Sequence, residues 1–185
     1  PDFPVRRADA LQAEEVEVIK GVGAIAYGSD AIGGVIRVNN EKIPSANGFS
    51  GNVILHGKTV NDALGTSIAI QNRKDNFFFK AKISGVDYAD FKVPTTEINY
   101  LNTKIPIYNN RMKNTAGDEY ALYLQAGYVS DHFQSILSIS NVKSKIGFFA
   151  GAHGIPSIAA VAEDGNKRDI NFPFQKVNHF KVISS

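Results

Sequence analysis

The sequence predicts a mainly β protein, in which a short α/β segment precedes an antiparallel up-and-down meander that forms an incomplete transmembrane β-barrel. Three observations lead to this fold class. From Phe49 onward, apolar and polar residues alternate in several segments of strand length. Because successive strand residues point to opposite faces, each such strand has one apolar and one polar face. The connections include very short turns and very long loops, which is typical of outer-membrane barrels.

The first forty residues combine a helical signal with two short runs of β-branched residues. Residues 8–15 favour a short helix, and the runs Val16–Ile19 and Val35–Val38 favour strands. Glycines and small residues separate the two runs, where tight turns need the conformational freedom of glycine. We therefore expect a compact α/β unit over residues 1–40. Residues 41–48 contain Pro, Asn and Gly and predict a linker.

Six alternating segments follow the linker, and their apolar positions fall on one face. The segments are residues 52–58, 64–72, 77–84, 120–128, 133–141 and 175–183. We expect one outward, lipid-facing band composed of Val53, Leu55, Ile68, Ile70, Phe79, Ile83, Leu122, Leu124, Leu137 and Ile139. We expect the opposite face, toward the lumen, to carry Lys80, Lys82, Gln125 and Gln134.

Two of the connections are much longer than the others. Thr59–Asp62, Arg73–Asn76 and Val129–Asp131 are turns, whereas residues 89–117 and 144–174 are long loops without a clear period. Such loops are uncommon in compact soluble domains but common on the outer side of membrane barrels. Because two strands separate the long loops, we expect both loops at the same end of the sheet.

The segment between residues 16 and 38, VEVIKGVGAIAYGSDAIGGVIRV, resembles the C-terminal half of the plug domain of TonB-dependent outer-membrane receptors. That family has an I-E-V-I-R-G-P run, a small-residue helix that ends in Y-G, and a G-G-V-I strand. The loop sequences YLNTKIPIYNNRMKNTAGDEY and GFFAGAHGIPS are also similar to those receptors. The resemblance implies that residues 1–40 are the C-terminal part of a plug, 41–48 a linker, and 49–185 the first strands of the barrel.

The resemblance also implies a function and a set of partners. The chain is expected to be an internal fragment of a receptor that binds and actively imports a scarce nutrient, such as a siderophore-bound metal. Its expected location is the outer membrane of a Gram-negative bacterium, in contact with membrane lipid. The expected energy source is the inner-membrane TonB complex, which would act through an N-terminal segment that this chain lacks.

Two charged residues of the plug-like segment correspond to positions that help to seat the plug in the barrel. Glu17 keeps the acid of the family, whereas Lys20 stands where the family has arginine and Val22 where it has proline. Lysine keeps the positive charge but lacks the planar fork with which arginine pairs a carboxylate. We therefore expect Glu17 and Lys20 to form plug–barrel contacts of altered geometry.

The long loops carry aromatic and hydrogen-bonding side chains together, a mixture that suits a bulky polar small-molecule ligand. The residues that we expect to bind it are Tyr100, Tyr108, Asn109, Arg111, Phe148, Phe149 and His153. Deletion of residues 147–154 is expected to weaken ligand binding while leaving barrel insertion intact.

Other classes of function find little support in the composition. The net charge of +2 is small and dispersed, which does not favour nucleic-acid binding. The chain has no cysteine, its four histidines are scattered, and no catalytic constellation is evident, so we expect neither an enzyme nor a cofactor or metal site. Two alternatives remain. A passive porin-like channel explains the strands but not the plug-like segment, and a soluble β-sandwich module predicts shorter loops.

Overall fold

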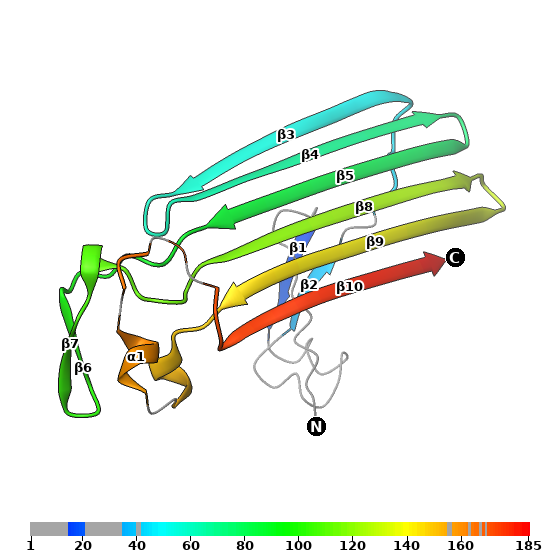
Figure 1. The fold of residues 1–185 in the computed structure, drawn as a ribbon. Helices are drawn as coiled ribbons and strands as arrows, with labels where there is room; N and C mark the ends of the chain where they lie inside the picture. The colour runs from blue at the N-terminus through cyan, green and yellow to red at the C-terminus, as the bar shows by residue number, and fades with distance from the viewer. Residues whose placement is uncertain are drawn as a thin grey trace.

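The computed structural model describes residues 15–20, 35–39, 42–154, 157–162, 164–166, 168 and 170–185. Its dominant feature is a six-stranded antiparallel sheet with the strand order β10-β9-β8-β5-β4-β3 (Figure 1). The predicted mainly β class and antiparallel meander are therefore confirmed. The predicted helix over residues 8–15 lies almost wholly outside the described residues. No helix in the described part of the chain is long and apolar enough to cross a membrane.

Neighbouring strands of the large sheet follow one another along the chain. The strands inserted between them, β6 and β7, form a separate pair between β5 and β8. The six strands are β3 (Gly48–Lys58), β4 (Ala63–Lys74), β5 (Phe77–Tyr88), β8 (Gly117–Val129), β9 (Gln134–Gly147) and β10 (Phe174–Ser184). The smaller elements are β1 (Glu15–Ile19), β2 (Val35–Asn39), β6 (Glu97–Tyr100), β7 (Thr103–Pro106), the 3-10 helices η2 (Tyr108–Asn110) and η3 (Ala150–His153), and α1 (Ile158–Val161). The hairpins β1–β2 and β6–β7 each form a separate antiparallel pair.

The predicted boundaries of the two long connections need correction. The first is not without structure, because it contains the β6–β7 hairpin and η2. The second begins after Gly147 rather than at residue 144, since β9 continues to pair with β8 and β10 through this stretch. Lys143 and Lys145 occupy positions of the otherwise apolar face there, so the apolar alternation is interrupted although the strand is not.

The first two short turns lie where the sequence places them, whereas the third spans residues 130–133 because Val129 still belongs to β8 and pairs with Gln134. Lys58 pairs with Ala63 across the first turn, and the second is tighter than predicted because Lys74 pairs with Phe77. Asp75 adopts a φ of 54° in that two-residue turn. Its backbone N–H donates to the Asn47 side-chain oxygen at 2.9 Å, which ties the preceding linker to the turn.

The two faces of the six-stranded sheet have an unusual distribution of exposure. On one face apolar side chains are exposed, for example Leu55 at 75% and Ile83 at 56%. On the other face Lys80 and Gln125 are each only 3% exposed. An antiparallel sheet of a water-soluble domain has the opposite arrangement, with the apolar face packed on a core. All ten residues that were predicted to form an apolar band lie on the face with exposed apolar side chains. The four residues that were predicted to lie opposite them are on the polar face.

The register aligns the apolar residues into rows that cross the sheet. One row runs from Val53 through Ile68, Ile83 and Leu122 to Phe180, interrupted only by Asn141 on β9. Rows of this kind continue from the Phe77–Tyr128 pair at the turn end to the Gly85–Tyr120 pair near the loop end. The eight residue steps from Phe77 to Gly85 span about 27 Å at the usual rise of a strand. We refer to this surface as the apolar band.

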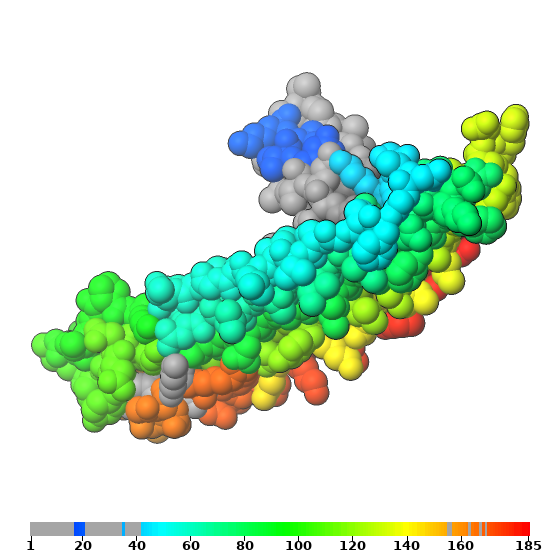
Figure 2. All heavy atoms as spheres, turned by 90° about the horizontal axis from the view of Figure 1, so that it is seen from above, coloured from blue at the N-terminus to red at the C-terminus, as the bar shows by residue number. Residues whose placement is uncertain are grey.

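The chain before β3 runs along the polar face. The Lys80 ammonium donates to the Lys42 carbonyl at 3.0 Å, and the Arg73 guanidinium donates to the Pro44 carbonyl at 2.7 Å. Figure 2 shows β1 on the concave side of the curved sheet. In the view of Figure 1 the β1–β2 hairpin overlaps β8 to β10. The chain therefore turns back over the polar face before it enters the sheet.

Candidate functional site

The two long connections lie at the same end of the sheet and pack against each other (Figure 1). Ile105 of β7, Ala150 of η3 and Val161 of α1 form a small buried cluster that joins them. Tyr100 and Phe149 are partly buried against this cluster. We call the described residues of 89–116 and 148–173 the loop cap. It has a core of its own, which the sequence analysis did not predict.

A single asparagine connects both halves of the loop cap. The Asn114 side-chain NH₂ donates to the carbonyls of Phe148 at 2.9 Å and Pro173 at 2.8 Å, and its oxygen accepts from the Asn171 N–H at 2.6 Å. Asn114 is buried and has a φ of 61°, a conformation that asparagine tolerates better than most residues. Because buried backbone groups require partners, this amide fixes the second loop against the first.

The base of the loop cap is held by buried charges. Asp90 is fully buried, and its Oδ1 accepts from the N–H groups of Thr115 at 2.6 Å and Ala116 at 2.8 Å. Arg111 donates to the Asp90 carbonyl at 2.8 Å and pairs with the Asp62 carboxylate at 2.6 Å. Asp62 belongs to the β3–β4 turn, so these contacts connect the cap to the sheet.

The predicted ligand-binding residues divide into two groups. The first group makes contacts within the loop cap: Arg111 forms the ion pair with Asp62, and Tyr100 and Phe149 pack against the buried cluster. Tyr108 and Asn109 are exposed on η2.

Phe148 and His153 form an edge-to-face ring pair with centroids 5.1 Å apart, and His153 is exposed. The structure thus brings Phe148 and His153 together through the short helix η3. Tyr108, Asn109 and His153 are the predicted ligand-binding residues that remain exposed. They provide an aromatic ring and hydrogen-bonding groups on the surface of one assembled unit.

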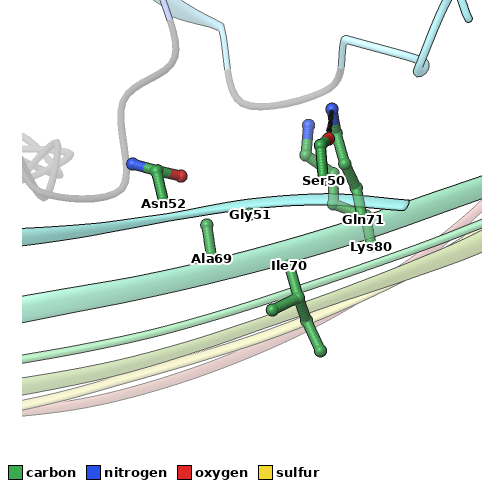
Figure 3. A pocket seen from close by; sticks show the side chains of 7 residues that line it. All are labelled: Ser50, Gly51, Asn52, Ala69, Ile70, Gln71 and Lys80. Atoms are coloured by element: carbon green, nitrogen blue, oxygen red, sulfur yellow. Dashed lines mark hydrogen bonds between the residues drawn. The ribbon is translucent and has the colours of Figure 1, made fainter. Parts of the chain in front are cut away.

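A shallow cavity of about 280 Å³ lies on the polar face near the start of β3. Figure 3 shows Ser50, Asn52 and Lys80 pointing to the side of the preceding chain, whereas Ile70 points to the opposite face. The Gln71 side chain donates to the Ser50 hydroxyl at 3.0 Å across this cavity. Its lining combines polar side chains with Ala69 and Ile70, and it can hold water or a small polar group beneath the linker.

The predicted plug–barrel residues lie on β1 and just after it. Glu17 and Lys20 are both exposed, and Glu17 occupies the position opposite Arg37 in the β1–β2 register. Their contacts with the sheet stay a prediction. Within the described residues, no group of three or more His, Asp or Glu residues is placed to hold a metal ion.

Gly147→Ala is expected to loosen the loop cap. A Cβ at this position would lie 2.7 Å from both the carbonyl and the side-chain oxygen of Asn114. Asn114 has to shift, and overpacking of this kind costs about 1–3 kcal/mol. Native-state hydrogen exchange of the cap amides should accelerate. The matched variant Gly57→Ala places its Cβ in an ordinary contact 3.5 Å from Ala63 and should leave exchange unchanged. Equal exchange in both variants would contradict this role of Gly147.

Comparisons with protein-family models, with curated proteins and with solved structures found no match.

Proposed function

We propose that the chain is a segment of a TonB-dependent receptor in the outer membrane of a Gram-negative bacterium, and that this receptor actively imports a small-molecule ligand. The observation that carries the proposal is the exposure of an apolar band on one face of the sheet while lysine and glutamine are buried on the other. Lipid on the apolar side and a polar interior on the other are the environments that such a sheet requires. In this proposal residues 49–185 belong to a transmembrane barrel wall.

The plug-like segment supports an importer rather than an open pore. Its two β-branched runs pair as the antiparallel hairpin β1–β2, and the chain between this hairpin and β3 makes hydrogen bonds to the polar face. A plug that lies inside a barrel would use the same face. We propose that residues 1–40 are the C-terminal part of that plug, with Glu17 and Lys20 in plug–barrel contacts and residues 41–48 as the linker.

The loop cap is proposed to be the ligand-binding region on the outer side. Recognition commonly resides in loops that a rigid scaffold positions. The exposed Tyr108, Asn109 and His153 are suited to contact the ligand directly, whereas Arg111, Tyr100 and Phe149 hold the cap in shape. Release into the cell would follow when the inner-membrane TonB complex pulls on the plug.

The test uses the complete receptor in cells. Uptake of iron bound to a siderophore is measured with and without a protonophore that abolishes the energised state of the inner membrane. An active importer loses uptake when the protonophore is added. Uptake that continues unchanged would favour a passive porin-like channel, and a receptor that is found in the aqueous fraction without detergent would contradict both membrane functions.

Tyr108→Ala combined with His153→Ala is expected to weaken ligand binding about tenfold or more, since truncation of an aromatic anchor commonly costs more than 1 kcal/mol. Both side chains are exposed, so the fold of the cap should persist. This pair is a sharper probe than deletion of residues 147–154, because the deletion also removes the buried Ala150. Binding is measured by titration of the purified receptor. Full affinity in the double variant would exclude these residues from the site.

A further inference from the structure

Three lysines lie together on the exposed face of β9 and β10, at the loop end of the apolar band. Lys145 and Lys176 are direct partners in the β9–β10 register, and Lys143 is two residues from Lys145 on the same face. Tyr120 is the direct partner of Lys143 on β8, and the next row toward the centre of the sheet contains Leu122 and Phe180. Positive charge therefore follows directly after aromatic and apolar residues along these strands. We call the three residues the lysine cluster.

Lys145 and Lys176 place two positive charges directly opposite each other. Like charges directly opposite each other on antiparallel strands destabilise a sheet. None of the three lysines forms an ion pair with another described residue. The Lys145 ammonium instead lies 5.0 Å from the centre of the Phe174 ring. Lys143 and Lys176 are exposed.

The two carboxylates in the row of Lys145 and Lys176 also pair with an arginine. Asp118 is opposite Lys145 on β8, but its carboxylate accepts from Arg168 at 3.4 Å. Asp87, the next residue in that row, forms an ion pair with the same Arg168. Arg168 and the lysine cluster provide four positive charges against these two negative ones. Together these six side chains carry a net charge of +2 at the loop end of the apolar band.

From this charge and its position we propose that the lysine cluster binds the phosphate of an anionic lipid headgroup. The inference rests on the proposed function, in which the apolar band contacts lipid. Lipid tails would lie along Phe180 and the rows below it, and the headgroup phosphate would then reach the three ammonium groups. Lysine side chains at a membrane boundary extend toward the headgroups, and each contributes about 1 kcal/mol, or about fivefold, to binding at an anionic surface.

The experiment compares lipid binding by two variants of equal charge. The complete receptor is reconstituted in nanodiscs of phosphatidylcholine with or without phosphatidic acid, and the phosphatidic acid that remains bound after purification is measured by mass spectrometry. In the first variant Lys143, Lys145 and Lys176 are each replaced by glutamine. In the control variant Lys58, Lys104 and Lys181, which lie outside the lysine cluster and the apolar band, are replaced in the same way.

The wild type and the control variant should retain phosphatidic acid in preference to phosphatidylcholine, and the cluster variant should lose this preference by about tenfold or more. Addition of inorganic phosphate should not displace the lipid, because a free anion lacks the contact with the apolar band. Three results would overturn the inference. They are equal retention of phosphatidic acid by all three proteins, an equal loss of it in both variants, and displacement of the lipid by inorganic phosphate. A wild-type protein that fails to insert would overturn the proposed function as well, whereas insertion without lipid preference would overturn only the inference.

Discussion

In the proposed membrane-inserted receptor, Leu124→Arg is expected to lower stability by about 2–4 kcal/mol. Leu124 lies in the middle of the apolar band, halfway along β8 between Tyr120 and Tyr128. Its direct neighbours are Ala81 on β5 and Ile139 on β9, both on the same face. A guanidinium at this depth would face hydrocarbon without an acidic neighbour, and the cost of such a charge is largest at the midplane of the bilayer.

The same substitution at a second leucine of the same face serves as the control. Leu64 is 71% exposed and lies at the loop end of the sheet, opposite Asp87. An arginine there is close to the headgroups, where the cost falls to about 0–1 kcal/mol. The free energy of unfolding in lipid vesicles is measured by urea titration for both variants. If both leucines tolerate arginine equally well, the apolar band does not contact lipid.

The faces of the strands could be predicted because they depend on local alternation alone. In the run FFFKAKIS, Phe79 and Ile83 fall on one face and Lys80 and Lys82 on the other. A period of two fixes this division wherever the chain is extended. The turns were equally local, since Asp and Asn at residues 75 and 76 favour the tight reversal that places Lys74 opposite Phe77.

The extent of β9 was harder to predict from alternation. Lys143 and Lys145 are on the exposed face, where the pattern calls for apolar residues. A charged residue at such a position is typical of a loop, although here the strand continues to Gly147. In a transmembrane β-barrel, the alternation of apolar residues ends at the edge of the hydrocarbon layer, whereas the strand itself continues into the headgroup region. The proposed membrane location would explain why β9 continues beyond its apolar residues.

The contacts that build the loop cap could not be predicted because they join residues that are distant in the sequence. Asn114 bonds to Phe148 and Pro173, which are 34 and 59 residues away. Arg111 was predicted to contact a ligand, and its partner Asp62 is 49 residues away. One sequence without a structure does not indicate which of many acidic residues a buried arginine will meet.

Asp90→Ala is expected to destabilise the loop cap by about 2–6 kcal/mol. The substitution removes the acceptor of the Thr115 and Ala116 N–H groups, and each buried amide left without a partner costs about 1–3 kcal/mol. Ala116 is fully buried, so water cannot easily take the place of the carboxylate. The expected result is rapid hydrogen exchange at both amides and a weakened connection between the cap and the sheet.

Asp90→Asn separates the role of the acceptor from the role of the charge. Both amides donate to the same oxygen, Oδ1, and an asparagine carbonyl can take that position. The Asn variant should therefore retain most of the protection from exchange that the Ala variant loses. Asp131→Ala, at an exposed turn on the other end of the sheet, should change neither exchange rate. If Asn and Ala at position 90 are equally damaging, the negative charge of Asp90 stabilises the cap, and the hydrogen bonds to Oδ1 are not the main cause.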